Sequence, residues 1–226
     1  MPSYPHRIRL RGPWEYEVVA DTTATTPTPL TGKTTLPCSL AQAGLTNNPQ
    51  TVRFLRRFGL PRFLDASEHI WLIVQPQASQ TEVILNEYGL AHFVGSGQFA
   101  VECTTHLLDR NLLEIVLQAR DDQDGLTGET YLEIRQSAYL QNARAQRAAN
   151  GHVQASVEIA GKAPANLDMY LLANRQSVAY ARPSEQDGIQ LITLESDGSI
   201  SSEISTLSLE LVYGGVVWYQ LDCSID

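Results

Sequence analysis

ILNEYGLAHFVGSGQFAVECTTHLLDRNLLEIVLQ, residues 84–118, holds the pattern that decides the fold. Asn86 stands where the chain must reverse, because Asn tolerates the left-handed backbone of turns, and Gly89 is available for a second positive φ. A glycine-punctuated stretch follows at Gly95-Ser96-Gly97, and an apolar run then extends from Asn111 to Gln118. Turn residues at this spacing, with apolar runs between them, predict β-strands rather than helices.

Further strands are predicted on both sides of this stretch. Arg7–Val19 alternates polar and apolar residues around Gly12-Pro13, which predicts two short strands meeting at a kink. Thr22–Thr35 is rich in Thr and Pro and predicts an exposed loop. Ile70–Gln75 is continuously apolar, the pattern of a strand covered on both faces. Other strands are predicted at 52–58, 81–85, 98–102, 111–118 and 129–135, and an acidic loop at 121–125.

The pattern changes after Ser137, where short apolar segments recur at the spacing of a β-sandwich. Residues 151–160 alternate strictly, and Leu207–Tyr213 with Val216–Leu221 predicts a hairpin, because Gly214-Gly215 accepts the primed turn that matches strand twist. Residues 136–149 are compatible with a helix, but strand plus loop is favoured. We therefore expect an all-β chain with two sandwiches and a boundary near Ser137.

Composition narrows the classes of function. The 226 residues carry a net charge of -9, which disfavours nucleic acid and anionic membranes as partners. No apolar run approaches the roughly 18 residues of a membrane span. The N-terminus has no apolar signal region, so a cytoplasmic location is expected. Cys38, Cys103 and Cys223 form an odd, widely spaced set, which predicts buried free thiols rather than disulfides, zinc ligands or a nucleophile.

Six motifs follow one another between residues 7 and 135. They are Gly12-Pro-Trp14-Glu-Tyr16, Phe54-Leu-Arg56-Arg57-Phe58-Gly-Leu-Pro61, Val83-Ile-Leu85-Asn86, Phe99-Ala-Val-Glu102-Cys-Thr104, Asn111-Leu-Leu113-Glu-Ile115 and Gly128-Glu-Thr-Tyr131-Leu-Glu-Ile134. In this order and spacing the segment resembles the N-terminal sugar-binding-like jelly roll of family 2 glycoside hydrolases, the β-galactosidase, β-glucuronidase and β-mannosidase group. The sequence departs from the family pattern at Glu87, which stands where the Val-x-Leu-Asn-Gly turn has glycine, and at Glu102, which stands where the family has Asp.

The resemblance implies a galactose-binding-like jelly roll over residues 1–136, followed by a smaller immunoglobulin-like β-sandwich over residues 137–226. In the family a catalytic (β/α)8 barrel comes next and supplies both catalytic carboxylates. A barrel needs about 250 residues, and these 226 are already assigned to sandwiches, so no catalytic residue is expected here.

Five motif residues are expected to be structural rather than ligand-binding. Asn86 suits a positive φ in a turn, and the side chains of Glu102 and Thr104 can bond backbone amides after Phe99. The structural set is Trp14, Arg56, Asn86, Glu102 and Thr104.

Candidate binding residues are few. Tyr88, His92 and Phe93 are expected to lie together in one loop, and exposed aromatic faces are what sugar rings stack on, so these three are the candidate carbohydrate-binding residues. The alternative places Phe93 in the core and the other two on the surface. Asp122 and Asp124 belong to a fragment of a calcium loop that lacks the bidentate Glu, so a structural calcium is a candidate and a solvated loop is favoured. No other metal and no cofactor is expected.

Three functions are left open by the sequence. The favoured one is a non-catalytic carbohydrate-binding or accessory protein with an oligosaccharide ligand. The second is a structural or protein-interaction module with a degenerate sugar site, which binds another protein or a second copy through the face that a barrel would cover. The third is an N-terminal fragment of a longer glycoside hydrolase. Glu87 and Ala91, where the family usually has glycine, favour the first two.

Overall fold

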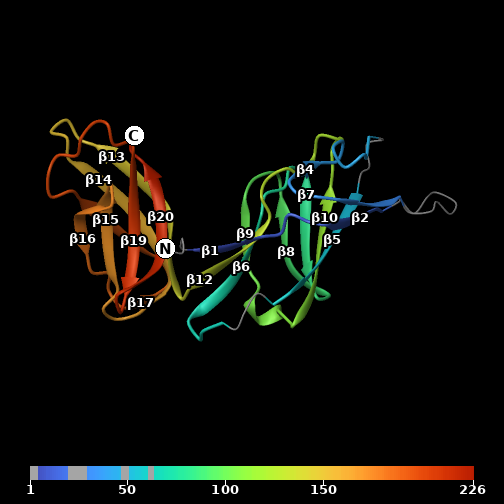
Figure 1. Ribbon diagram of the computed structural model, residues 1–226, viewed down its shortest axis with the longest axis horizontal. Helices are drawn as coiled ribbons and strands as arrows, with labels where there is room; N and C mark the ends of the chain where they lie inside the picture. Colours follow the sequence, from blue (N-terminus) through green and yellow to red (C-terminus); the bar gives the residue numbers. More distant parts are fainter. Residues whose placement is uncertain (1–4, 20–29, 47–50, 61–63) are drawn as a thin grey trace. The chain divides into compact units, whose positions relative to one another are not determined.

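The regular secondary structure is almost entirely β-strand in a computed structural model that describes residues 5–19, 30–46, 51–60 and 64–226 (Figure 1). In these ranges the single helical element is the 3-10 turn η1, Thr104–His106, and no helix has the length to cross a membrane. The chain divides into two compact units. We call residues 7–65 and 69–133 the jelly-roll unit, and residues 134–226, with 1–6 and 66–68, the immunoglobulin-like unit. The predicted boundary between residues 136 and 137 stays a prediction.

The jelly-roll unit is a sandwich of two main sheets, and the chain crosses between them several times. One sheet has the order β1-β12-β6-β9 and the other the order β3-β2-β5-β10-β7-β8, while β4 and β11 form a small third sheet. The strands are β1 His6–Arg9, β2 Trp14–Val18, β3 Thr31–Thr34, β4 Cys38–Ser39, β5 Thr51–Gly59, β6 Glu68–Val74, β7 Gln80–Leu85, β8 Tyr88–Val94, β9 Phe99–Glu102, β10 Arg110–Gln118, β11 Gly125–Leu126 and β12 Tyr131–Gln136.

Alternating side chains form the core of this unit. Along β10, Leu113, Ile115 and Leu117 are buried while the residues between them are half-buried, as the period of two predicts. Trp14 is fully buried, and its indole N–H donates to the Leu10 carbonyl oxygen over 2.6 Å. A buried indole needs such a partner, so this bond fixes the kinked start of β2.

The immunoglobulin-like unit is a second sandwich with its own core. Its strands are β13 Ala138–Arg147, β14 Val153–Ala163, β15 Asp168–Ala173, β16 Gln176–Ala181, β17 Gln186–Asp187, β18 Gln190–Glu195, β19 Thr206–Tyr213 and β20 Val216–Ser224. In one sheet, β14 pairs with β13 on one side and with β18 and then β17 on the other side. The second sheet has the order β16-β15-β19-β20. The predicted all-β class is confirmed, and residues 138–147, where a helix was the alternative, form a strand.

Two predicted loops are wrong. Residues 31–34 of the predicted loop at 22–35 form strand β3, which pairs with β2 from Trp14–Thr34 to Glu17–Thr31. Residues 22–29 of that loop lie outside the described residues. Tyr88–Val94, expected to be a loop, is strand β8 at the edge of the six-stranded sheet. Both segments are edge strands in which no side chain is fully buried, so neither carries a strong apolar pattern in the sequence.

Three hairpin turns use positive φ at both central residues, which the right-handed twist of paired strands favours. Gly214 and Gly215 do so as predicted, with φ of 57° and 79°. Between β7 and β8, however, the pair is Asn86 and Glu87, with φ of 50° and 72°, and Gly89 is not used for this purpose. The turn between β15 and β16 repeats the pattern with Asn174 and Arg175.

The three cysteines are free and buried, as predicted. Burial, with a smaller effect of the Glu102 carboxylate, raises the pKa of Cys103 to about 12, and burial also raises the pKa of Cys38 and of Cys223. We therefore expect that the native protein does not react with a coloured disulfide reagent at pH 8. After unfolding in urea, all three cysteines should react, and each should release one equivalent of the reagent's coloured thiolate. The absorbance of the released thiolate measures the reaction. Rapid reaction of even one cysteine in the folded protein would contradict this packing.

Candidate functional site

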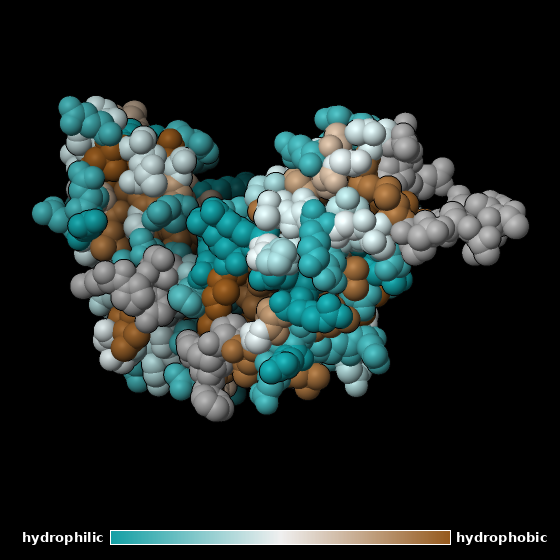
Figure 2. Space-filling model, turned by 45° about the vertical axis from the view of Figure 1, so that its right-hand side comes forward, coloured by the Kyte–Doolittle hydropathy of each residue, from teal (hydrophilic) through white to brown (hydrophobic). Residues whose placement is uncertain are grey.

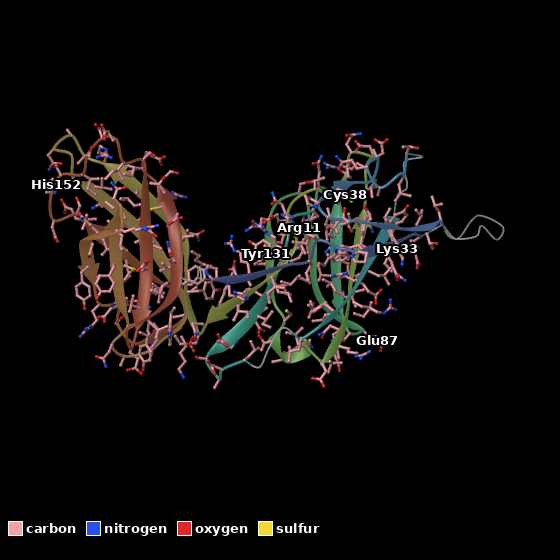
Figure 3. All side chains as sticks on the ribbon, in the orientation of Figure 1. Arg11, Lys33, Cys38, Glu87, Tyr131 and His152 are labelled. Atoms are coloured by element: carbon pink, nitrogen blue, oxygen red, sulfur yellow. The ribbon has the colours of Figure 1, made fainter. Side chains whose placement is uncertain are left out.

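A hollow of about 620 Å³ opens at one end of the jelly-roll unit, where three chain segments come together. These are the end of β5, the turn between β7 and β8, and the start of β10. Figure 3 labels Glu87 in the turn beside it. The lining residues are Arg57, Phe58, Gly59, Asn86, Asp109, Arg110, Asn111 and Leu112.

Asn86 holds the β7–β8 turn against the start of β10. Its side-chain oxygen accepts from the Leu112 amide over 2.9 Å, and its side-chain amide donates to the His106 carbonyl oxygen over 2.8 Å. Its own backbone N–H donates to the Leu112 carbonyl oxygen. Positive φ at Asn86 is what turns these groups toward β10, so the residue that reverses the chain also builds one wall of the hollow.

Asn111 continues this network and rigidifies the neighbouring wall. It is buried, and its side-chain oxygen accepts from Asn86 over 2.9 Å and from the Leu108 amide over 2.8 Å. Its side-chain amide returns a bond to the Leu108 carbonyl oxygen. Buried polar networks with every member bonded fix one conformation, so the hollow has a preformed floor.

The charged side chains at the hollow make fewer hydrogen bonds and ion pairs within the protein than its two asparagines do. Asp109 and Arg110 are exposed and have no polar side-chain partner among the described residues. Arg57 is exposed too, with one ion pair to Glu15 at 3.4 Å. A carboxylate and planar guanidinium groups over a rigid floor can accept and donate hydrogen bonds to the hydroxyl groups of a sugar.

The three candidate carbohydrate-binding residues do not form one group. Tyr88 lies next to the hollow, because it follows the turn and its ring packs 5.0 Å from that of His106. His92 pairs with exposed Glu82, whereas Phe93 pairs with buried Thr81 and stacks on Phe99 at 4.3 Å. Successive residues of a strand point to opposite faces, so His92 and Phe93 cannot line the same surface. Binding by these residues stays a prediction, and geometry favours Tyr88.

The remaining motif residues are engaged within the jelly-roll unit. Arg56 donates from Nη1 to the Pro13 carbonyl oxygen over 2.7 Å. Glu102 accepts from the Thr104 amide over 3.0 Å, and the Thr104 hydroxyl accepts from the Ile70 amide over 2.8 Å. Together with buried Trp14, these bonds tie β2, β6 and η1 to their neighbours.

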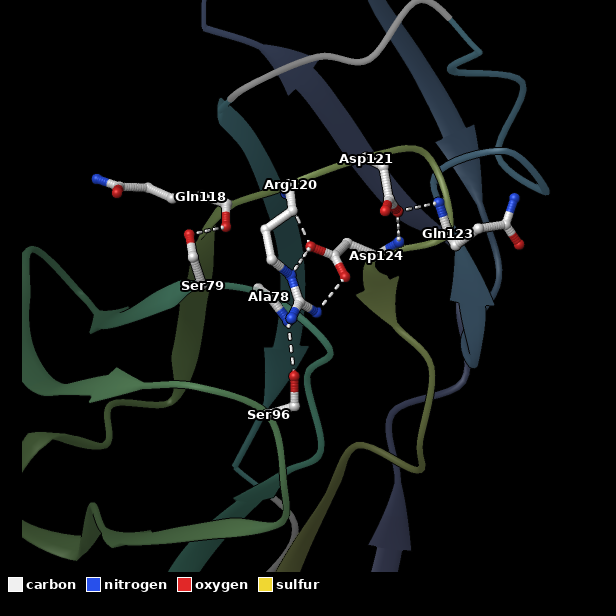
Figure 4. A network of polar contacts seen from close by, with 8 residues as sticks. All are labelled: Ala78, Ser79, Ser96, Gln118, Arg120, Asp121, Gln123 and Asp124. Carbon is white, nitrogen blue, oxygen red and sulfur yellow. Dashed lines mark hydrogen bonds and ion pairs between the residues drawn. The ribbon is translucent and has the colours of Figure 1, made fainter.

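The acidic loop is held by the side chain of Arg120 rather than by a metal ion (Figure 4). Asp124 is buried, and its oxygens accept from the Arg120 side chain over 2.6 and 3.0 Å and from the Arg120 amide over 2.8 Å. Asp122 bonds the side chain of Gln123 over 3.1 Å. No group of three metal-ligating side chains occurs in the ranges that the structure describes. The arrangement favours an ion pair over calcium at Asp124.

Sequence reasoning missed Arg57, Asp109 and Arg110 as hollow-lining residues. Arg57 was assigned to a strand motif, and Asp109-Arg110 precedes a strand without any pattern of its own. The available signal was their position, because polar residues at strand ends are carried to the loop end of a sandwich, where ligands bind.

Tandem β-sandwiches of this kind, a jelly roll and then an immunoglobulin-like sandwich, also occur in solved structures of glycoside hydrolases. Solved structures with this fold include β-glucuronidase 3 of Bacteroides uniformis (TM-score 0.72, 16% identity) and the β-glucuronidase of Bifidobacterium dentium (TM-score 0.72, 15% identity). A third is a glycosyl hydrolase family 2 member from Bacteroides cellulosilyticus (TM-score 0.71, 13% identity).

The match extends over 100%, 98% and 97% of this chain, respectively, but over 35%, 49% and 36% of those structures. This chain therefore spans between a third and a half of their length. No protein-family model matches the sequence, and no curated protein matches it either. At these identities the likeness establishes the fold, and the predicted jelly roll with an immunoglobulin-like sandwich is confirmed.

Replacing Glu87 by glycine is expected to stabilise the jelly-roll unit. The φ of 72° at Glu87 costs a residue with a Cβ about 1–2 kcal/mol, and glycine avoids this at a smaller entropic cost. We expect a net gain of about 0.5–1 kcal/mol, measured by urea unfolding. Arg175→Gly at the equivalent turn, with φ of 66°, is the matched comparison. A loss of stability in Glu87→Gly alone would mean that the Glu87 side chain makes a contact worth more than the strain.

Proposed function

We propose that this protein is a non-catalytic carbohydrate-binding unit of the type that accompanies family 2 glycosidases. The observation that carries the proposal is the rigid hollow with Asp109, Arg110 and Arg57 at its surface, on a fold shared with β-glucuronidases. Its volume of about 620 Å³ falls in the range of small-molecule sites. Tyr88, 61% exposed beside the hollow, offers an aromatic face for a sugar ring.

Three carboxyl groups of this chain are unsuited to the acid step of glycoside hydrolysis. A glycosidase needs a general acid whose pKa is raised. Hydrogen bonds from Gln141 and Asn142 lower the pKa of Glu158, and those from Tyr180 and Arg182 lower the pKa of Asp168. Burial opposes ionisation of Asp124, but bonds from Arg120 outweigh it and lower that pKa as well. The pKa of each of these three carboxyl groups is therefore shifted away from the direction that acid catalysis requires.

Calorimetric titration with a panel of neutral and acidic oligosaccharides tests the proposal. We expect saturable binding to at least one, weakened about tenfold in Arg110→Ala and in Asp109→Ala, since each removes a charge-assisted hydrogen bond. Arg144→Ala, an exposed arginine of the immunoglobulin-like unit, is the control and should bind as the parent does. Absence of binding across the panel, or equal affinity in all three variants, would reject the hollow as a sugar site.

A second candidate is a protein-interaction module, favoured by apolar side chains at the surface of the immunoglobulin-like unit (left in Figure 2). The exposed ones are Tyr180, Ile189, Leu191 and Val216, at 51%, 64%, 68% and 53%. Sedimentation velocity over a wide concentration range separates the two candidates. Self-association that Leu191→Ser abolishes would support the module, and a monomer at every concentration would count against self-association.

A further inference from the structure

A second, smaller hollow of about 140 Å³ lies at the start of β2 and is lined mainly by cationic side chains. The ladder between β2 and β5 begins at the Glu15–Leu55 pair, so Arg56 and Arg57 lie beyond the end of this ladder, while both still pair with β10 on the other side. Lys33 of β3 approaches from the other side of β2 and is labelled in Figure 3. Three cations and a single carboxylate, Glu15, therefore surround one hollow in a chain whose net charge is -9.

The described residues do not satisfy all the donors of these three cations. Glu15 lies 3.9 Å from Lys33 and 3.4 Å from Arg57, well beyond the roughly 2.7–2.9 Å of a close charge-assisted bond. Arg56 donates to the Pro13 carbonyl oxygen from Nη1, but its Nε is buried without a hydrogen-bond acceptor in the part of the chain that the structure describes. Native proteins pair nearly all such donors, with an ordered water or ion if no protein group is available. The geometry thus calls for an external acceptor.

Space for a larger molecule adjoins this hollow. A neighbouring hollow of about 360 Å³ shares Glu15, Lys33 and Leu55 with it, and also contains Glu17. Its two carboxylates make that side unfavourable for negative charge, so an acidic group would sit at the arginines. Arg57 also lines the hollow of about 620 Å³ described above.

We propose that Lys33, Arg56 and Arg57 form a binding site for an oxyanion: a carboxylate, sulfate or phosphate group. Guanidinium groups match the planar or tetrahedral array of oxygens on such groups, and the ammonium of Lys33 adds charge without demanding an orientation. The group can belong to a free inorganic ion or to an acidic sugar. The site needs no sugar ring, and it shares Arg57, but not Asp109 or Arg110, with the proposed sugar site.

Calorimetric titration at constant ionic strength, with sulfate, phosphate, glucuronate and glucose as separate probes, tests this site. We expect saturable sulfate binding that weakens about tenfold in Lys33→Gln and in Arg57→Gln. Lys162→Gln, which changes the only other lysine of the sequence, should bind as the parent does. Both test residues are exposed, and circular dichroism confirms that the variants fold. Sulfate also stabilises proteins by exclusion from their surface, and that effect acts equally on all variants.

The outcomes separate the sources of the anion. Glucuronate that competes with sulfate, while glucose does not bind, identifies an acidic sugar; sulfate or phosphate binding alone identifies an inorganic ion. No saturable binding of any anion, or equal binding in Lys33→Gln and Lys162→Gln, overturns the site. Arg110→Ala should leave sulfate affinity unchanged, so failure of the sugar site is distinguishable from failure of this one.

Discussion

Replacing Gly161 by alanine is expected to reduce the free energy of unfolding of the immunoglobulin-like unit by about 3 kcal/mol or more. Gly161 has φ of 90°, which costs a residue with a Cβ about 1–2 kcal/mol. The new Cβ would also overlap the Ser137 carbonyl oxygen. That oxygen accepts from the Lys162 amide over 2.7 Å, so it cannot retreat without losing the bond. Overpacking of this kind costs about 1–3 kcal/mol more.

Denaturant unfolding followed by circular dichroism measures this loss. Gly198→Ala in the same unit is the matched control, because no atom lies within 4 Å of its new Cβ and its φ is outside the left-handed region. It should unfold within about 0.5 kcal/mol of the parent. A Gly161→Ala protein as stable as this control would mean that β13 and β14 do not approach each other as described.

Replacing Asp124 by asparagine is expected to destabilise the jelly-roll unit by about 2–3 kcal/mol. The change removes the charged acceptor of three bonds from Arg120, and the buried amide then faces a guanidinium group that cannot accept its hydrogens. The backbone of this loop also holds the segment after β4. The Leu40 amide donates to the Asp124 carbonyl oxygen, and the Ala41 amide donates to the Asp122 carbonyl oxygen. Asp122→Asn, in the same loop but without an ion pair, is the control.

The loss of stability in Asp124→Asn is expected to depend on pH, and the direction follows from the pKa of Asp124. Bonds from Arg120 outweigh the effect of burial and lower the pKa of Asp124 in the folded state, below the value of about 3.9 that Asp has in the unfolded chain. The stabilisation is therefore complete above about pH 4 and is lost as the pH falls through the lowered value. The difference between the parent and Asp124→Asn should be constant from about pH 5 to 8 and shrink in acid. A difference independent of pH down to full acid unfolding would contradict the ion pair.

Much of the strand pattern could be read from local residues. Apolar residues recur at every second position in the first part of β14 because one face of the strand is buried, so its period of two is visible in the sequence. Along β10 the apolar run identifies a strand, and burial alternates within it. Asn86 was predictable as a turn residue because a short polar side chain tolerates positive φ. Its bonds to His106 and Leu112 were not, since they depend on which strand lies opposite.

The expected sugar-binding loop could not be predicted correctly from its own residues. Tyr88, His92 and Phe93 are close in sequence, but pairing with β7 makes their segment a strand and sends His92 and Phe93 to opposite faces. A glycine and polar neighbours suggested a loop, and the hydrogen bonds of one partner strand were enough to override that preference.

What the amino-acid sequence determined by itself is the all-β class, the two sandwiches and the turns, because these follow from the period of burial and from residues with special backbone freedom. Only the tertiary structure decided which polar groups meet. Arg110 faces the hollow because β10 pairs with β5 in the register that sets it opposite Gly59, 51 residues earlier in the chain (110 − 59 = 51). Lys33 joins Arg56 and Arg57 because β2 lies between β3 and β5. Such neighbours are chosen by strand register, which is set by the packing of whole sheets and leaves no mark on the residues that it brings together.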